Sequence, residues 1–362
     1  MTQSLDLLQR HRSPLLDAIR GIAVLLVVFY HCTIEYEPQS LDAMARWLAK
    51  YGFLGVDVFF PLSGFLITGF LLRRHALHDV RVFFQRRLFR ILPLYWLALA
   101  TWLIAALVTG QGRELIPNLW QNALFITGWM IYANGRSTVP FTITWSLSVE
   151  ELAYVIIGVA ALFLRRRMPI AILLVGVASF LLRIWLGTQE SLRVLYFYPP
   201  ARLDSIMIGG ILAWFVHQKS NTVPAIICIL GASLLMSSVS DGAYRALLLF
   251  NVSLMTCLAI AVAQKYLYDW RSPFIIPLAD IGFYSYFIYL FHYFNVTGLD
   301  LALSKFGLVL PFWPFSALVI LVTYLQARLS FLFFEGPVML WGRRHEGSGQ
   351  SPDHGSCSPR RL

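Results

Sequence analysis

The chain has 362 residues, of which 58% are hydrophobic and only 13% are charged. Soluble domains carry about 25% charged residues, so this composition excludes an ordinary soluble protein and indicates an integral membrane protein. The net charge of +10 does not indicate a nucleic-acid partner, because the basic residues lie at the ends of apolar segments. There they set membrane topology and contact anionic lipid headgroups, so we expect membrane lipids, and no nucleic acid, as partners.

The apolar segments predict an all-α polytopic membrane protein with about ten transmembrane helices, since about 20 apolar residues span a bilayer. The expected spans are residues 14–34, 53–72, 91–110, 144–164, 169–187, 203–218, 222–240, 246–264, 280–298 and 308–334. The last span is long, and we expect a break or a tilt near Pro311 and Pro314. Residues 118–133 are apolar and aromatic but short, which favours an interfacial or re-entrant segment.

We predict that both termini are cytoplasmic. In that orientation most lysine and arginine residues lie in the cytoplasmic segments, where membrane proteins carry an excess of them. The chain then divides into three parts. Residues 1–13 form a cytoplasmic lead, and residues 14–340 form the membrane domain. Residues 341–362 form a cytoplasmic tail, which is rich in Gly, Ser, Pro and charge and is expected to be disordered.

Ionisable side chains inside apolar segments are costly, and they usually face a bundle interior or a wet cavity. Arg20 and His31 are eleven residues apart on the first span, so they share one helical stripe and lie about 16 Å apart along the axis. Counting depth from the cytoplasmic face predicts two layers of such residues. The inner layer holds Arg20, Arg87 and Arg90; the outer layer holds His31, Asp57, Glu150 and Arg202, with His292 as a further candidate.

The two layers suit different chemistry. Guanidinium groups present a planar fork of donors that matches phosphate oxygens, whereas a carboxylate beside an imidazole suits a general base. The pattern predicts an anionic cytoplasmic cosubstrate below a reaction centre. The chain has no HExxH, P-loop or GxSxG motif, and its histidines are not at metal-ligand spacing, so we expect no metal site.

Each of these residues also has a purely structural interpretation. Arg87 and Arg90 could be topology anchors, and Arg20 could simply pair with Asp17 three residues earlier. His31 could be a hydrogen-bonded core histidine. Asp57 and Glu150 could sit at helix starts, where carboxylates interact favourably with the helix dipole, and Ser63 with Gly64 could be close-packing small residues.

The order of these motifs resembles that of the integral membrane O-acyltransferases called acyltransferase family 3, found chiefly in bacteria. The matching elements are Arg-x10-His (Arg20, His31), residues 55–60 with 62–68, Arg-x-x-Arg (Arg87, Arg90), Ser-xxx-Glu (Ser146, Glu150), residues 202–204, residues 284–286 with His292, and residues 334–337. The resemblance covers residues from about 14 to 340. The chain departs from the common family pattern at Pro61 and at Leu152-Ala153, and neither departure changes a proposed site residue.

The resemblance implies an enzyme that transfers an acyl group, most often acetyl, from cytoplasmic acyl-CoA to a hydroxyl acceptor. That acceptor would be a glycan, a glycolipid or a small molecule. The resemblance also implies a multi-pass protein of the bacterial cytoplasmic (inner) membrane. No cofactor would be bound permanently, and acyl-CoA, with acetyl-CoA as the first candidate, would be the donor substrate.

On this resemblance, Arg20, Arg87 and Arg90 are expected to bind the donor phosphates. His31 would deprotonate the acceptor hydroxyl while Glu150 orients its ring, or would carry the acyl group transiently. Ser146, Ser63 or Arg202 would stabilise the developing oxyanion. Asp57 is a further candidate for the catalytic site.

A second interpretation, from another functional class, is a transporter of a glycolipid or metabolite that uses the same groups as a proton relay. It predicts movement of a substrate without a covalent product. The sequence leaves open a succinyl or longer donor in place of acetyl, and it leaves open which acceptor is used.

Overall fold

The computed structural model describes residues 13–73, 77–187, 192–237, 241–266 and 272–344, and these ranges contain only helices, turns and loops. Helices satisfy every backbone hydrogen bond within one segment, which a chain in lipid requires. The predicted all-α polytopic architecture is therefore confirmed. The helices are α2 (Pro14–Cys32), α3 (Ala43–Tyr51), α4 (Gly55–Leu72), α5 (Leu77–Thr109), α6 (Trp120–Ala123), α7 (Thr127–Asn134), α8 (Trp145–Phe163), α9 (Met168–Gly187), α10 (Leu192–Phe197), α11 (Leu203–His217), α12 (Val223–Ser237), α13 (Asp241–Tyr266), α14 (Ile275–Phe283), α15 (Ser285–Lys305), α16 (Phe312–Ser330) and α17 (Gly336–Arg344).

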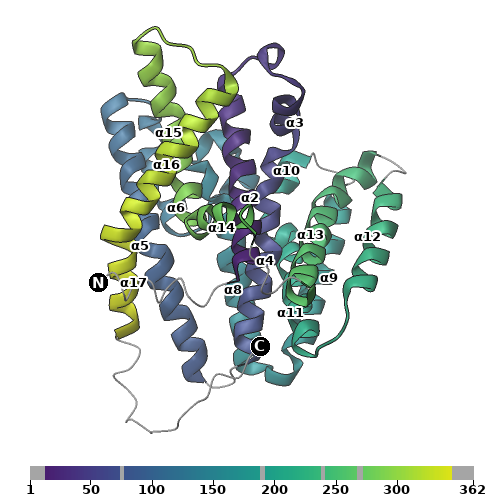
Figure 1. Ribbon diagram of the computed structural model, residues 1–362. Coiled ribbons are helices and arrows are strands. Elements are labelled where there is room, and N and C mark those ends of the chain that lie inside the picture. The colour runs from purple at the N-terminus through teal and green to yellow at the C-terminus, as the bar shows by residue number, and fades with distance from the viewer. Residues whose placement is uncertain (1–12, 74–76, 188–191, 238–240, 267–271, 345–362) are drawn as a thin grey trace.

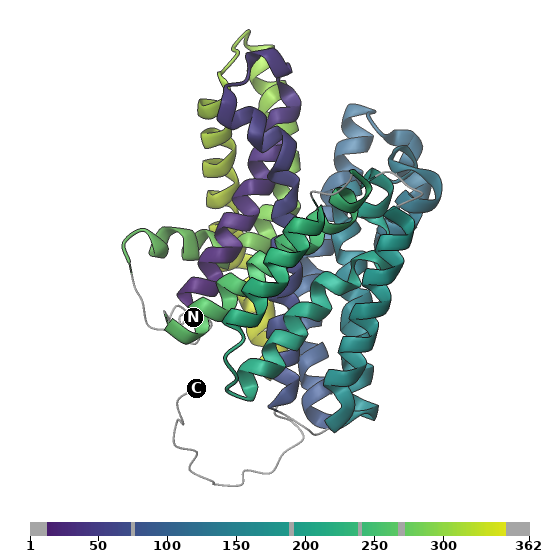
Figure 2. The same ribbon diagram turned by 90° about the vertical axis from the view of Figure 1, so that its right-hand side faces the viewer.

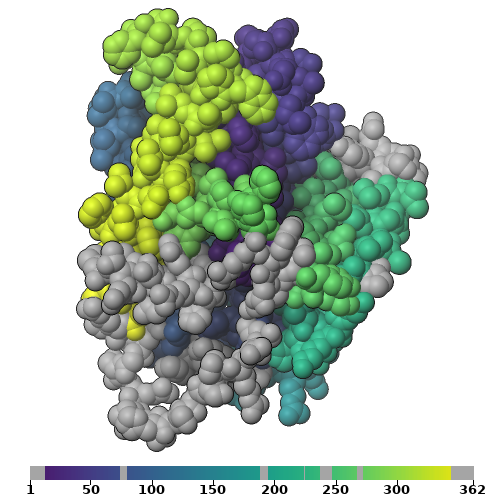
Figure 3. All heavy atoms as spheres, viewed as in Figure 1, coloured from purple at the N-terminus to yellow at the C-terminus, as the bar shows by residue number. Residues whose placement is uncertain are grey.

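The long helices run roughly side by side, whereas α14 lies across them (Figures 1 and 2). Figure 3 shows α14 at the surface of one face, next to the yellow-green helices of the C-terminal part. Figure 1 shows the start of α2 and the end of α17 in the same half of the bundle. Helix α17 continues to Arg344, past the expected domain boundary at 340; the expected lead and most of the expected tail lie outside the described residues.

The number of spans differs from the expected ten. Seven stretches of the described ranges are long and apolar enough to cross a membrane, and α14 with α15 adds an eighth if the pair is one bent span. Each expected span does contain a helix, but α11 and α12 have 15 residues each. About 20 residues are needed to cross a bilayer perpendicularly, so these two helices are short for independent spans.

Two expected spans also differ in shape. The expected span 280–298 breaks at Tyr284, which leaves the helical conformation, and α14 and α15 meet at a bend of 77°. A Cβ atom at Gly282 would lie 1.7 Å from the Asp17 carbonyl oxygen, so only glycine lets α14 cross α2 this closely. The last span has no break at Pro314, because α16 begins directly after Pro311 and its first turn tolerates proline.

Helix α4 packs most extensively against α11, and glycines set the distance between them. A Cβ atom at Gly64 would lie 1.8 Å from the Ile206 carbonyl oxygen, and one at Gly209 would lie 2.0 Å from that of Pro61. The two backbones are therefore in direct contact. Pro61 lies inside α4, which continues unbroken from Gly55 to Leu72.

Residues 118–133 form no span, as expected, but two short helices, α6 and α7, of 4 and 8 residues. A buried amide anchors this segment: Asn122 Nδ2 donates to the Phe141 carbonyl oxygen at 2.8 Å and to Thr144 Oγ1 at 2.9 Å. The backbone N–H of Gly128 donates to Ser148 Oγ at 3.1 Å. The segment thus covers the first turn of α8, which begins inside the protein.

Candidate active site

The expected inner layer of arginines lines one cavity of about 370 Å³, which we call the arginine cavity. Arg20 reaches it from α2, and Arg87 and Arg90 reach it from α5. Arg86, which the sequence analysis assigned to no layer, lines it as well. Four guanidinium groups from two helices therefore face one space, as a polyanionic ligand requires.

The structural partner expected for Arg20 is also present. Arg20 Nη1 lies 2.6 Å from Asp17 Oδ1. Because the same guanidinium also lines the arginine cavity, the ion pair holds Arg20 in place and does not exclude a role in binding.

Glu150 does not lie where the sequence analysis expected it. Its Oε2 atom is 3.2 Å from Arg87 Nη2, it accepts a hydrogen bond from the Tyr154 hydroxyl, and it lines the arginine cavity. The Arg87 guanidinium also stacks 3.1 Å from the centre of the Tyr154 ring. Glu150 therefore orients Arg87, and the expectation that it orients His31 is not met.

His31 lines a second cavity of about 380 Å³, which we call the histidine cavity. Its walls are largely aromatic: Tyr30, Phe53, Trp145, Tyr196, Phe197 and Tyr289. Lys50 and Arg136, two residues outside the expected layers, also line it. The sequence carries no periodic signal for these two cations, because they lie on the helix and turn that precede α4 and α8.

The partner of the His31 ring is a second histidine. His292 Nε2 lies 3.2 Å from His31 Nδ1, and each Nδ1 atom lies close to a carbonyl oxygen of its own helix, Val27 at 2.9 Å and Ile288 at 3.0 Å. A carbonyl oxygen only accepts hydrogen bonds, so both Nδ1 atoms are assigned as protonated. His292 Nε2 then accepts from His31 Nδ1, and His31 Nε2 is left as the ring nitrogen that can accept a proton.

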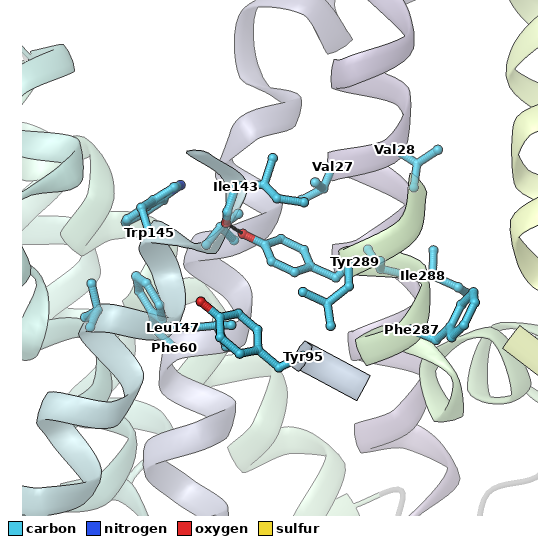
Figure 4. Packing of buried hydrophobic residues seen from close by; sticks show 14 of the residues in the cluster. Val27, Val28, Phe60, Tyr95, Ile143, Trp145, Leu147, Phe287, Ile288 and Tyr289 are labelled. Atoms are coloured by element: carbon cyan, nitrogen blue, oxygen red, sulfur yellow. Dashed lines mark hydrogen bonds between the residues drawn. The ribbon is translucent and has the colours of Figure 1, made fainter. Parts of the chain in front are cut away.

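Ser146 and Ser63, two candidates for oxyanion stabilisation, line the arginine cavity and not the histidine cavity. Ser146 Oγ lies 2.9 Å from the hydroxyl oxygen of Tyr289. The Tyr289 hydroxyl donates to the Ile143 carbonyl oxygen at 2.6 Å, and Figure 4 shows the ring reaching from α15 to that residue. Ser146 is therefore held at the boundary between the cavities.

Asp57 and Arg202 pair with each other, and neither is exposed or lines either cavity. The Arg202 guanidinium also stacks on the rings of Phe60 and Tyr196. Nearby, Arg183 pairs with Asp204. An arginine within a membrane span needs an acidic partner. Arg183 lies in the fifth expected span, so the sequence indicates that it has such a partner, although it does not indicate which residue.

Within the described ranges, no group of three or more His, Cys, Asp or Glu side chains could hold a metal ion. The candidate site consists of the arginine cavity and the histidine cavity, and His31, which lines the histidine cavity, contacts His292.

Comparison with known proteins identifies the family. The family described as "Acyltransferase domain" matches residues 14–327. The peptidoglycan O-acetyltransferase OatA of Listeria monocytogenes is 27% identical over 363 residues, covering 90% of this chain and 55% of the relative. The O-acetyltransferase OatA of Staphylococcus aureus is 28% identical over 364 residues, covering 90% of this chain and 57% of the relative. The chain therefore spans a little more than half the length of these relatives, and no solved structure matches it.

Proposed function

The chain belongs to the acyltransferase domain family, and from this membership and the two cavities we propose that it is a membrane O-acyltransferase. It moves an acyl group, with acetyl as the first candidate, from acyl-CoA to a hydroxyl of a glycan. The arginine cavity faces the cytoplasm, as do both termini, and the membrane is the cytoplasmic membrane of a bacterium.

The observation that carries the proposal is the hydrogen-bonding pattern of His31. With Nδ1 bonded to the Val27 carbonyl oxygen and close to His292 Nε2, the Nε2 lone pair is the basic site of the ring. A neutral imidazole of defined tautomer, lining a cavity, is what a general base for a hydroxyl group requires.

The arginine cavity supports a phosphate-bearing donor. Arg20, Arg87 and Arg90 present planar forks of donors, and such forks bind phosphate oxygens in pairs. Helix α2 separates Arg20 from His31 by eleven residues, or about 16 Å along its axis. An extended pantetheine arm spans such a distance, so phosphates held at the arginines would leave the thioester near His31.

The reaction then proceeds as an acyl transfer. His31 Nε2 takes the proton of the acceptor hydroxyl as its oxygen bonds to the thioester carbonyl carbon. The carbon–sulfur bond breaks, and the departing CoA thiolate receives the proton from the His31 imidazolium. In the covalent variant, His31 Nε2 attacks the thioester itself and passes the acyl group to the hydroxyl in a second step.

The names of the relatives support the acceptor and the acyl group. The Listeria relative is named as a peptidoglycan O-acetyltransferase, and peptidoglycan is a carbohydrate polymer with free hydroxyls. The aromatic walls of the histidine cavity provide flat apolar surfaces against which the C–H faces of sugar rings pack.

Mass spectrometry of the glycans of the producing cell tests this function. Cells expressing the chain should carry glycans heavier by one acyl group, and cells expressing His31→Ala should lack them. The variant His217→Ala, which changes an exposed histidine at the end of α11, should behave as the unchanged protein. Movement of a glycolipid across the membrane with no covalent product would instead identify a transporter and overturn the proposal.

A further inference from the structure

The arginine cavity and the histidine cavity are adjacent, and two residues line both of them: Val56 of α4 and Tyr289 of α15. The Tyr289 side chain is large and only 8% of the residue is exposed. It therefore forms much of the boundary between the two cavities.

The hydroxyl of Tyr289 is bonded to one residue from each cavity. It donates to the carbonyl oxygen of Ile143, which lines the histidine cavity, at 2.6 Å. A phenol has one proton, so at 2.9 Å from Ser146 Oγ it accepts; Ser146 lines the arginine cavity. The two bonds tie α15 to the start of α8 across the boundary, as Figure 4 shows for Ile143.

The boundary lies on the path that the donor must take. This step rests on the proposed function, in which the donor phosphates bind on one side of Tyr289 and His31 acts on the other. A passage that stayed open would admit water to the thioester, and exclusion of water prevents such hydrolysis. It would also let solutes cross the membrane.

We propose that Tyr289 is the gating residue of the acyl route. Its ring closes the passage between the cavities, and its hydrogen bonds to Ile143 and Ser146 hold it closed. When the pantetheine arm enters, the ring moves aside. The hydroxyls of Tyr289 and Ser146 then bond to the amide groups of the arm in place of each other. Phe59, whose ring centre is 6.5 Å from that of Tyr289, lines the arginine cavity at this point.

A thiol placed in the arginine cavity reports on the gate without any acyl transfer. Ser63→Cys introduces it, in a background with Cys228→Ser and Cys357→Ser; Cys32 and Cys257 are buried. An impermeant anionic methanethiosulfonate is applied to one face of sealed vesicles at a time. With Tyr289 present, modification should occur only from the arginine face.

The variant Tyr289→Ala should abolish this sidedness, so that the thiol reacts from both faces. Tyr289→Phe keeps the ring but removes both hydrogen bonds, so the thiol should react slowly from the histidine face. This variant also tests the gate if the alanine variant does not fold. Tyr95→Phe is the matched control, because it removes a buried hydroxyl that donates to the Asn122 carbonyl oxygen and lines neither cavity; sidedness should persist.

Reaction from the histidine face with Tyr289 intact, or unchanged sidedness in Tyr289→Ala, would overturn the gate. Suppose instead that Tyr289→Ala loses sidedness but the unchanged protein transfers no acyl group. That result would support the gate and overturn the acyltransferase proposal, so the two failures are distinguishable.

Discussion

His292 Nε2 lies 3.2 Å from His31 Nδ1, although 261 residues separate the two histidines in the chain. The contact joins α2 to α15, and it involves the His31 nitrogen that the Val27 carbonyl oxygen, at 2.9 Å, assigns as protonated. We therefore propose His292 as the positioning residue for His31, in place of Glu150.

His292→Phe should lower kcat and leave the KM for the donor unchanged. It removes one of the two acceptors near the His31 Nδ1 proton, the other being the Val27 carbonyl oxygen, and it changes no arginine. A hydrogen bond contributes about 0.5–1.5 kcal/mol, so kcat should fall by about 2- to 12-fold. His292→Gln supplies an amide oxygen as acceptor and should restore most of the loss. Steady-state kinetics of the two variants check this, and an equal loss in both would contradict the positioning role.

Glu150→Gln should raise the KM for the donor while leaving kcat nearly unchanged, since Glu150 holds Arg87 at 3.2 Å. Gln keeps an acceptor oxygen but not the charge, so the bond should weaken by about 1–1.5 kcal/mol, which predicts a rise of about 5- to 12-fold. The neighbouring Glu151 lies 3.8 Å from Arg87 Nε, so Glu151→Gln is the control and should have the smaller effect. A fall in kcat at constant donor KM would return Glu150 to the role beside His31.

The sequence predicted the arginine cavity better than the histidine cavity. Arg20, Arg87 and Arg90 each lie near the start of an apolar segment on the same side, so counting residues from the segment ends was enough to group them. Tyr289 was not singled out as a site residue. The available signal was its position one turn before His292, which gives both residues one helix face.

The prediction that Glu150 lies in the outer layer beside His31 fails for a physical reason. The depth count assumed that its helix begins at the membrane surface, but α6 and α7 cover the start of α8, where Trp145 is buried. Each residue of α8 therefore lies deeper than its number suggests. The sequence does place His292 in the same outer layer as His31. It does not predict the direct contact of the two rings, because the contact depends on the bend between α14 and α15, and residues 280–298 contain no proline to indicate a break.

Asp57→Ala should destabilise the protein and leave the activity of the folded fraction intact. The change leaves the guanidinium of Arg202 buried without its carboxylate, and such losses cost about 3–5 kcal/mol. Asp57→Ala combined with Arg202→Met removes both charges and should recover part of the stability. Thermal unfolding in detergent measures the effect; lost activity at an unchanged melting temperature would make Asp57 catalytic.

Gly64→Ala should destabilise the contact between α4 and α11, because its Cβ would lie 1.8 Å from the Ile206 carbonyl oxygen. Overpacking of this kind costs about 1–3 kcal/mol. Gly69→Ala lies on the same helix with its nearest contact at 3.8 Å, and there alanine should be neutral or stabilising by up to about 1 kcal/mol. Equal melting temperatures for the two variants would contradict the close packing.

The central claim is that His31 performs the chemistry of acyl transfer. Its most direct test is transfer of the acetyl group from radiolabelled acetyl-CoA to glycan by the reconstituted protein. His31→Ala should reduce the rate by about 10²- to 10⁴-fold, the contribution typical of a general base, while His217→Ala retains full activity. Transfer by His31→Ala at the rate of the unchanged protein would contradict the account.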